Sequence, residues 1–177
     1  MRTGLTKLLA NPQAWLKNYR IGLIANPTTI APNLAHAADL LAKHPEIHLL
    51  KLFGPEHGIR GDEQDMLSVD DTIDRQTGLP VISLYGKTFK SLKPLPEHLN
   101  DIDLLIFDMQ DIGTRYYTYA ATMALAMQAA ADAHIKMLVL DRPNPIGDIQ
   151  IEGGGIATGM ENFCGLYSIP QRHAMTL

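Results

Sequence analysis

The chain has 177 residues, of which 46% are hydrophobic, and its formal net charge is −4 at pH 7. This length suits one domain with at most a small extension, and the hydrophobic share is large enough for a core, which excludes a disordered chain. Acidic and basic residues are interspersed without a basic patch, so we expect no nucleic acid as a partner. The single cysteine, Cys164, excludes an internal disulfide framework.

The N-terminal stretch, residues 1–12, carries charge but lacks a long apolar segment. We therefore expect a short helix there and not a signal peptide. No apolar run approaches the roughly 18 residues that a transmembrane helix needs, so we expect no membrane span. These features predict a cytoplasmic protein, or a periplasmic or secreted one if a leader has been removed.

Strand and helix patterns alternate along the chain. Short apolar runs typical of buried strands lie at 20–25, 47–53, 79–85, 102–107 and 136–140. Helical patterns lie at 33–43, 96–100 and 117–134. Strands that are apolar on both faces and separated by helices indicate a parallel sheet covered on both sides. We therefore predict an α/β fold: a Rossmann-like, doubly wound, mostly parallel sheet with helices on both faces.

The first strand is not followed by the glycine fingerprint of a dinucleotide site. Residues 26–29 read Asn-Pro-Thr-Thr, where a dinucleotide-binding fold has Gly-x-Gly-x-x-Gly. We therefore expect no cofactor.

The loop at 53–61 is the most distinctive segment of the sequence. It holds a carboxylate, an imidazole and a guanidinium, those of Glu56, His57 and Arg60, among three glycines and a proline. A loop of this composition gives up conformational freedom to aim polar groups, which is typical of active sites. The whole connection from 54 to 78 is also longer than ordinary loops, which favours a functional role.

Polar residues follow at least four of the predicted strands. In open α/β sheets, ligands bind beyond the carboxyl ends of the strands, so we expect these side chains to meet at one edge. They are Asn26 after the first strand, Glu56 and His57 after the second, Asp108, Gln110, Asp111, Arg115 and Tyr117 after the fourth, and Asp141, Arg142 and Asn144 after the fifth.

Structural roles compete with these functional ones. Asp108 or Asp141 could cap a helix or a turn, and Arg142 is better explained as a partner of these acids than as a substrate contact. The tyrosines at 116, 117 and 119 are explained either by packing or by sugar recognition through stacking and hydroxyl contacts.

Two chemistries fit this cluster. Glycoside hydrolysis needs a carboxylic acid to protonate the leaving oxygen and a second carboxylate as base or nucleophile. Glu56 lies beside apolar neighbours and suits the acid, because partial burial of its carboxyl would favour the protonated form. Asp108, Asp111 or an acid at 62–65 could be the second carboxylate. Metal-assisted phosphoryl transfer would want Asp-x-Asp after a strand, and Gln110 breaks that spacing. His57 has no second histidine at ligand spacing, so we expect no metal site.

Four motifs, spread in order over nearly the whole chain, resemble those of the DUF1343 family, which includes NamZ-type exo-β-N-acetylmuramidases. They are Pro-Glu-His-Gly-Ile-Arg-Gly at 55–61, Thr-Gly-Leu-Pro-Val-Ile-Ser-Leu-Tyr-Gly at 77–86, Phe-Asp-Met-Gln-Asp-Ile-Gly-Thr-Arg-Tyr-Tyr-Thr-Tyr at 107–119, and Asp-Arg-Pro-Asn-Pro at 141–145.

The resemblance implies a Rossmann-like N-terminal domain that carries the active site. It implies removal of terminal N-acetylmuramic acid from peptidoglycan fragments in cell-wall turnover and recycling, with a muramic acid-containing sugar or muropeptide as ligand. Glu56 matches the family's glutamate and is the favoured catalytic residue, with Asp108 and Asp111 as further catalytic candidates. The residues expected to bind substrate are Asn26, His57, Arg60, Gln110, Arg115, Tyr117, Asp141, Arg142, Asn144, Arg172 and His173. An arginine among them could pair with the lactyl carboxylate of muramic acid.

Family members usually continue past an Arg-His-Gly-Met-Thr motif into a C-terminal domain. Here residues 172–176 read Arg-His-Ala-Met-Thr, and the chain ends at 177. We therefore expect 1–150 to form the Rossmann-like catalytic-type domain and 151–177 to begin a connection to a C-terminal domain absent from this chain. An oligomer could form through the surface that this absence leaves. The alternative function is an inactive, truncated sugar- or peptidoglycan-binding module, and a metal-dependent hydrolase is the less favoured third.

Overall fold

The computed structural model describes residues 2–61, 72–86 and 88–177. These residues contain one six-stranded sheet in the order β3-β4-β2-β1-β5-β6. The strands are β1 Arg20–Ala25, β2 His48–Gly54, β3 Thr72–Ile73, β4 Pro80–Ser83, β5 Leu104–Asp108 and β6 Lys136–Val139. The helices are α1 Gly4–Ala10, α2 Pro12–Leu16, α3 Ala37–Lys43, the 3-10 helix η1 Phe89–Leu92, α4 Pro96–Leu99 and α5 Tyr119–Asp132.

The sheet is parallel except for the short strand β3, which pairs antiparallel with β4. β1 lies between β2 and β5, so the chain extends the sheet first to one side of β1 and then to the other. This reversal of strand order is the topological switch point at which doubly wound folds bind ligands. The predicted α/β class and mostly parallel sheet are confirmed.

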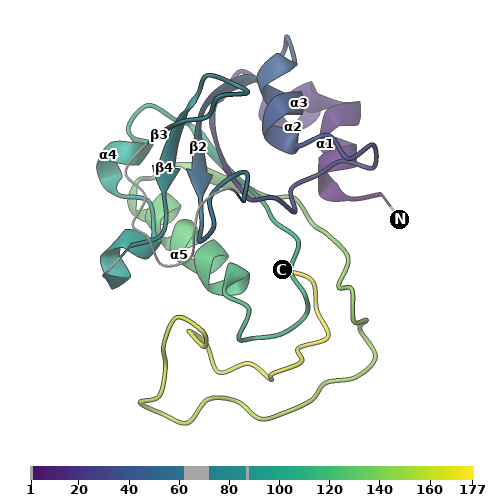
Figure 1. Ribbon diagram of the computed structural model, residues 1–177, viewed down its shortest axis with the longest axis vertical. Coiled ribbons are helices and arrows are strands. Elements are labelled where there is room, and N and C mark those ends of the chain that lie inside the picture. The colour runs from purple at the N-terminus through teal and green to yellow at the C-terminus, as the bar shows by residue number, and fades with distance from the viewer. Residues whose placement is uncertain (1, 62–71, 87) are drawn as a thin grey trace.

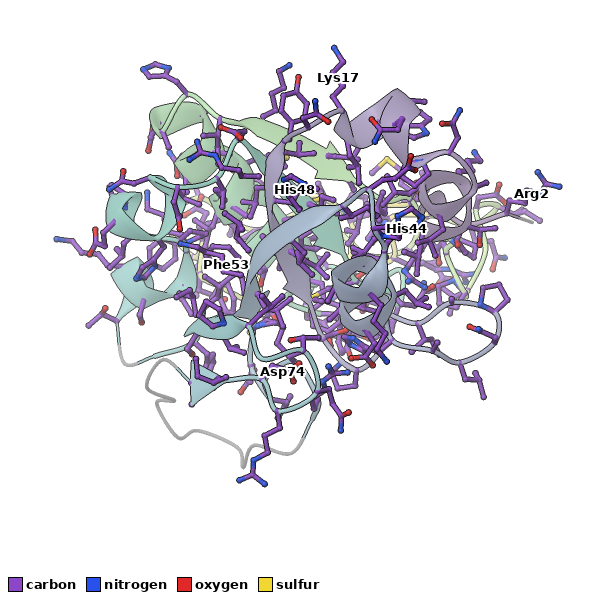
Figure 2. The ribbon with its side chains drawn as sticks, turned by 90° about the horizontal axis from the view of Figure 1, so that it is seen from above. Arg2, Lys17, His44, His48, Phe53 and Asp74 are labelled. Carbon is purple, nitrogen blue, oxygen red and sulfur yellow. The ribbon has the colours of Figure 1, made fainter. Side chains whose placement is uncertain are left out.

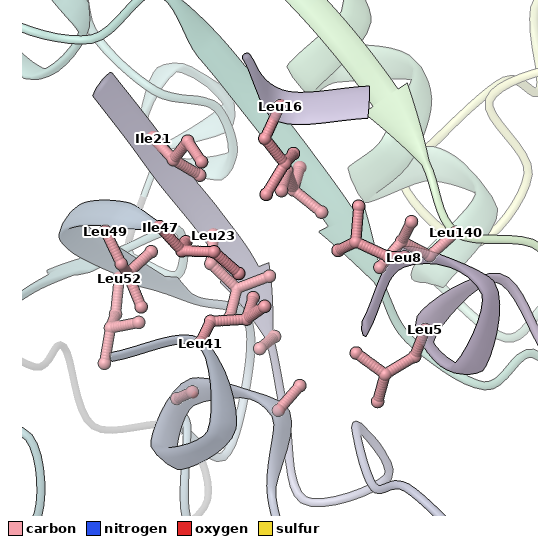
Figure 3. Packing of buried hydrophobic residues seen from close by; sticks show 14 of the residues in the cluster. Leu5, Leu8, Leu16, Ile21, Leu23, Leu41, Ile47, Leu49, Leu52 and Leu140 are labelled. Atoms are coloured by element: carbon pink, nitrogen blue, oxygen red, sulfur yellow. The ribbon is translucent and has the colours of Figure 1, made fainter. Parts of the chain in front are cut away.

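Two apolar clusters cover the two faces of the sheet. Leu8 of α1 and Leu41 of α3 pack with Leu23 on one face, as Figure 3 shows. On the other face Ile24 packs with Ala126 of α5. The helices α1 to α3 and the helices α4 and α5 therefore lie on opposite sides, as in Figure 1. The alternation of Leu23 and Ile24 is the reason that the strands are apolar at successive positions.

Gly22 leaves room for neighbouring side chains to lie over β1 on one face of the sheet. A Cβ atom at this position would lie 2.7 Å from the ring of Phe53 and 2.9 Å from the side chain of Ile102. Any larger residue would therefore require the side chains of Phe53 and Ile102 to shift.

Several predicted boundaries were wrong by a few residues. The helix expected from 33 begins at Ala37, because Leu34 adopts a φ of 65° in a turn and His36 accepts a hydrogen bond from the Ala38 amide at 3.2 Å. The helix expected at 117–134 covers only α5, and the strand expected at 79–85 covers only β4. The N-terminal helix expected before residue 12 is present, and a second helix, α2, follows it directly.

The C-terminal part of the chain, after β6, contains only isolated bridges and no named helix or strand. In Figure 1 it forms a long open loop that returns toward the body of the molecule at the C-terminus. The division at residue 150 stays a prediction. Among the described residues, no helix is long and apolar enough to cross a membrane.

Candidate active site

The ends of β1, β2 and β5 meet at one edge of the sheet. Ile24 pairs with Phe53, and Ala25 pairs with Asp108, so the next residues of all three strands leave the sheet side by side. Asn26 follows β1, and Glu56 stands in the loop after β2. The structure thus brings together the strand ends on which the sequence analysis placed polar residues.

A tight turn presents Glu56 at this edge. The amide of Gly58 donates to the carbonyl of Pro55 at 3.0 Å, which closes the turn around Glu56 and His57. His57 and Gly58 both have a φ of 71°, a conformation that L-residues rarely adopt. Pro55 is buried, Glu56 is half-buried and His57 is exposed. The backbone therefore holds the Glu56 carboxyl at the boundary between the core and the solvent.

Arg60 fastens this loop to two other parts of the molecule. Its guanidinium donates to both oxygens of Asp74, at 3.0 and 2.8 Å, and to both oxygens of Asp39, at 3.1 and 2.7 Å. In Figure 2, His48 and Phe53 mark the direction of β2, and Asp74 lies beyond the Phe53 end. Arg60, expected to bind substrate, is thus held by two carboxylates of the protein itself. Its place in the structure is that of an anchor for the loop.

The anchor makes a pH-dependent contribution to stability. The hydrogen bonds from Arg60 lower the pKa of Asp74 from its usual value to about 2. Because this folded-state pKa lies below the unfolded one, the stabilisation is present above about pH 4 and is lost as the pH falls toward 2. We expect Asp74→Asn to cost roughly 1–2 kcal/mol of unfolding free energy at neutral pH and progressively less in acid. Urea unfolding of both proteins across this range measures the difference.

Asp132→Asn is the matched control, since Asp132 is exposed and its Oδ2 lies 3.9 Å from Nζ of Lys93, a long contact at the surface. It should leave the stability nearly unchanged at every pH. A loss in Asp74→Asn that stays constant from pH 7 down to about pH 3 would contradict the role of the Asp74 charge.

Asp108 and Arg142 form a buried ion pair under the site. Nε of Arg142 lies 2.5 Å from one carboxylate oxygen of Asp108, and the second oxygen accepts from Nη2 at 3.0 Å. Asp108 is wholly buried, and Arg142 also donates to the carbonyl of Ile30 at 3.2 Å. Burial raises the pKa of the Asp108 carboxyl, and the Arg142 guanidinium opposes that shift. The structural pairing considered for Arg142 is therefore what the structure shows, and both side chains are buried.

Asp111 is also engaged inside the protein. One of its oxygens accepts from the amide of Gly113 at 2.7 Å and lies 3.2 Å from Nε2 of His173. The other ring nitrogen of His173 accepts from the amide of Met175 at 3.3 Å, which places the imidazole proton on the nitrogen that faces Asp111. Both side chains are buried. This pair ties the C-terminal segment to the loop after β5.

Two further arginines expected to bind substrate hold the same C-terminal segment. Arg115 donates to the carbonyls of Gly154 at 2.7 Å and Ile169 at 2.6 Å. Arg172 donates to Oε1 of Gln150 at 3.1 Å. These contacts order the segment around the loop after β5, and the substrate-binding roles of both arginines stay predictions.

The other residues predicted after β5 and β6 lie in two places. They are Gln110, Asn144 and Asp141. The side chain of Gln110 donates to the carbonyl of Pro143 at 2.8 Å and so joins the two loops. Asn144 donates to the carbonyl of Met175 at 2.9 Å. Asp141 is exposed and borders a cavity of about 160 Å³ next to α1 and Trp15. Gln110 and Asn144 therefore stabilise the loop end, whereas Asp141 faces the N-terminal helices.

Asn26, Tyr117 and Tyr119 gather near Glu56. The rings of the two tyrosines contact edge to face, with centroids 4.6 Å apart. Burial raises the pKa of the Tyr119 hydroxyl, and the adjoining Tyr117 hydroxyl and the charge of Glu56 act in the same direction, while Asn26 opposes them. For Tyr119, the sequence left both packing and sugar recognition open. Its place two residues after Tyr117, at the start of a helix that follows a strand end, was the available signal.

Two further expectations concern the second carboxylate and a metal site. The acids at 62–65, considered for the second carboxylate, lie outside the described residues. Within the described residues, no group of three histidine, cysteine, aspartate or glutamate side chains could hold a metal ion.

Comparison with known proteins places the chain in a family. Residues 21–177 match the family model described as exo-beta-N-acetylmuramidase NamZ, N-terminal. The chain belongs to this family. It is 50% identical over 177 residues to the peptidoglycan beta-N-acetylmuramidase NamZ of Bacillus subtilis (strain 168), and the match covers all of this chain and 42% of that protein.

Solved structures of the DUF1343 family share the fold. A DUF1343 family protein from Bacteroides fragilis NCTC 9343 superposes with a TM-score of 0.90 at 44% identity, covering 99% of this chain and 43% of that one. A second one from the same organism gives a TM-score of 0.81 at 35% identity, covering 98% and 43%. The resemblance to this family is confirmed, and the chain spans less than half the length of these NamZ and DUF1343 relatives.

Proposed function

We propose that the chain carries the Glu56 side of a glycosidase site, which removes terminal N-acetylmuramic acid from peptidoglycan fragments. One observation carries the assignment: of the three candidate catalytic acids Glu56, Asp108 and Asp111, Asp108 and Asp111 are buried and Glu56 is half-buried. The membership of the NamZ family supplies the substrate class. A muramic acid-containing sugar or muropeptide is then the ligand.

Glu56 would act as the general acid that protonates the leaving glycosidic oxygen. The turn that holds Glu56 is fixed by the Gly58 hydrogen bond and by the Arg60 anchor, which limits the positions that the carboxyl can take. Such pre-positioning favours proton transfer, because the acid must lie within hydrogen-bond reach of the oxygen that it protonates.

The roles of Asp108 and Asp111 change under this proposal. Both were candidates for the second carboxylate, but each is buried and held by a basic partner, Arg142 or His173. A nucleophile or base must reach the sugar or its attacking water. We therefore assign Asp108 and Asp111 to positioning the loops, and the second group to the 62–65 acids or to the part of the longer relatives that this chain does not span.

The test is hydrolysis of a chromogenic β-glycoside of N-acetylmuramic acid by the 177-residue chain. We expect release of the chromophore, and much slower release from the matching N-acetylglucosamine glycoside, which lacks the lactyl group. Calorimetric binding of muramic acid fragments without any turnover would overturn the enzyme assignment in favour of a sugar-binding module. Loss of the activity on adding a chelator would favour the metal-dependent hydrolase.

A further inference from the structure

Residues 26–36 connect β1 to α3 and are called the β1 loop below. The imidazole of His36 joins the two ends of this loop, because its Nε2 lies 2.9 Å from the carbonyl oxygen of Asn26. Its Nδ1 accepts from the amide of Ala38 at 3.2 Å and so caps α3. A carbonyl oxygen can only accept and a backbone amide can only donate, so the imidazole is neutral and carries its proton on Nε2.

The β1 loop is also closed by backbone hydrogen bonds. The amide of Thr29 donates to the carbonyl of Asn26 at 2.9 Å, and the amide of Ala37 donates to the carbonyl of Thr29 at 2.8 Å. Nearer the tip, the amide of Ala31 donates to the carbonyl of Ala35 at 2.9 Å. A displacement at either end of the loop therefore shifts the residues between the two ends.

On one side, the β1 loop contacts the loop after β5. The amide of Gln110 donates to the hydroxyl oxygen of Thr28 at 3.0 Å. The hydroxyl of Thr29, which is wholly buried, donates to the carbonyl of Asp108. The backbone at the end of β5 therefore takes its place from two consecutive threonines of the β1 loop.

On the other side, the β1 loop contacts the loop that presents Glu56. A Cβ atom at Gly61 would lie 2.8 Å from Cγ of Pro27, so the two loops approach each other closely there. The neighbouring Arg60 holds Asp39, which lies in the first turn of the helix that follows the β1 loop. The β1 loop thus lies between the two loops that carry the candidate acids.

We propose that His36 is a positioning residue of the glycosidase site: its neutral imidazole, through the hydrogen bond from Nε2 to the Asn26 carbonyl, holds the β1 loop between the loop that presents Glu56 and the loop after β5. His36 acts through the backbone that it holds. The inference rests on the proposed function for its effect on catalysis, because it assigns a role in the same site.

Only the neutral imidazole fits this position. Protonation of Nδ1 would place two N–H groups against each other, that of the ring and that of Ala38, and so displace the ring. Burial lowers the pKa of His36 below its usual value of 6.5. Because the folded-state pKa lies below the unfolded one, the stabilisation from this imidazole is complete above about pH 6.5 and is lost as the pH falls below it.

The charged groups around His36 do not stabilise an imidazolium enough to reverse this shift. The guanidinium of Arg60 lowers the pKa further, while the hydrogen bond to the β1 loop and the charges of Asp39 and Asp74 oppose the effect of burial. Asp108 at the end of β5 is also within reach of the imidazole charge. Since each of these three carboxylates is already paired with an arginine, none is free to hold an imidazolium.

Two substitutions in the 177-residue chain separate the contact with the β1 loop from the helix cap. In His36→Gln the amide nitrogen takes the place of Nε2 and can still donate to the Asn26 carbonyl, but the cap on Ala38 is lost. In His36→Asn the carboxamide oxygen takes the place of Nδ1 and can still cap α3, but the side chain is too short to reach Asn26. Neither new side chain titrates.

The first measurement needs no turnover. It is the solvent exchange of the Gln110 amide, followed by NMR, because this N–H donates to the β1 loop. We expect faster exchange in His36→Asn and unchanged exchange in His36→Gln. The second measurement is kcat on the chromogenic N-acetylmuramic acid glycoside, which should fall roughly 10- to 100-fold in His36→Asn and stay within about 3-fold in His36→Gln. A role in capping alone would give the opposite order.

The pH dependence supplies a third measurement. Relative to His36→Gln at the same pH, the unsubstituted protein should show faster Gln110 exchange and a lower kcat/KM as the pH falls below about 6.5. His44→Asn is the matched control, because His44 ends the same helix and its Nδ1 accepts from the amide of Glu46 at 3.2 Å. It should leave the exchange and kcat within about 2-fold.

Three outcomes would overturn the inference: unchanged Gln110 exchange or unchanged kcat in His36→Asn, equal losses in the two His36 variants, or the same pH dependence in His36→Gln and the unsubstituted protein. If His36→Asn does not fold, the comparison of His36→Gln with the unsubstituted protein across pH carries the test. A chain that shows the expected Gln110 exchange but hydrolyses no glycoside would refute the proposed function and leave the hold of His36 on the β1 loop standing.

Discussion

Glu56→Gln is expected to lower kcat on the chromogenic N-acetylmuramic acid glycoside by roughly 10²- to 10⁴-fold, the usual contribution of a general acid. The amide keeps the size of the carboxyl group but has no proton to give to the leaving oxygen. The turn is closed by backbone atoms of Pro55 and Gly58 and does not depend on the carboxyl, so the fold should survive. Binding of free N-acetylmuramic acid should remain, because the substitution removes proton transfer and leaves the sugar contacts.

Glu46→Gln provides the control for this experiment. Glu46 is exposed in the loop between α3 and β2, before the strand that leads to the site. Its replacement should leave kcat within about 2-fold. Rates in Glu56→Gln equal to those of the unsubstituted protein would remove Glu56 from the mechanism and with it the main support for the glycosidase proposal.

The architecture could be predicted because it follows from local patterns. Every residue of β5 is buried, and the unbroken apolar run at 104–107, which is followed by Asp108, predicts a buried strand. Strand β3 could not be predicted, because it has only two residues, both exposed, and depends on its pairing with β4. The start of α3 was misplaced since the turn at Leu34 is set by backbone conformation and not by hydrophobic spacing.

The sequence predicted which residues lie at the candidate site, but it did not predict which of them have a structural role. The sequence places Glu56, Asp108 and Asp111 at strand ends, but it does not say which carboxylate will be held by a basic side chain from a distant part of the chain. Arg142 stands 34 positions beyond Asp108, and His173 stands 62 beyond Asp111. Only the folded chain shows that Arg142 holds Asp108 and His173 holds Asp111, and that Glu56 is the half-buried acid of the three. The same holds for Arg60, whose loop suggested a ligand contact before its two partners were known.

The buried pair of Asp108 and Arg142 should produce the largest effect on stability. We expect Asp108→Ala to reduce the free energy of unfolding by roughly 3–5 kcal/mol, because it leaves the Arg142 guanidinium buried without a counter-charge. The side chain of Arg142 is only 7% exposed, so water cannot take the place of the carboxylate without opening the site. Urea unfolding at neutral pH measures the loss.

Asp103→Ala breaks a pair of similar geometry in a different environment. Arg20 donates to both oxygens of Asp103, at 3.0 and 2.7 Å, but these side chains are 50% and 36% exposed. Solvent replaces the lost partner there, so the stability should change little. Replacing both members of the buried pair, Asp108→Leu with Arg142→Met, should cost less than Asp108→Ala alone, since no unpaired charge is left inside. Equal losses in Asp108→Ala and Asp103→Ala would mean that burial does not set the strength of the Asp108–Arg142 pair, and the positioning role assigned to Asp108 would then have no energetic basis.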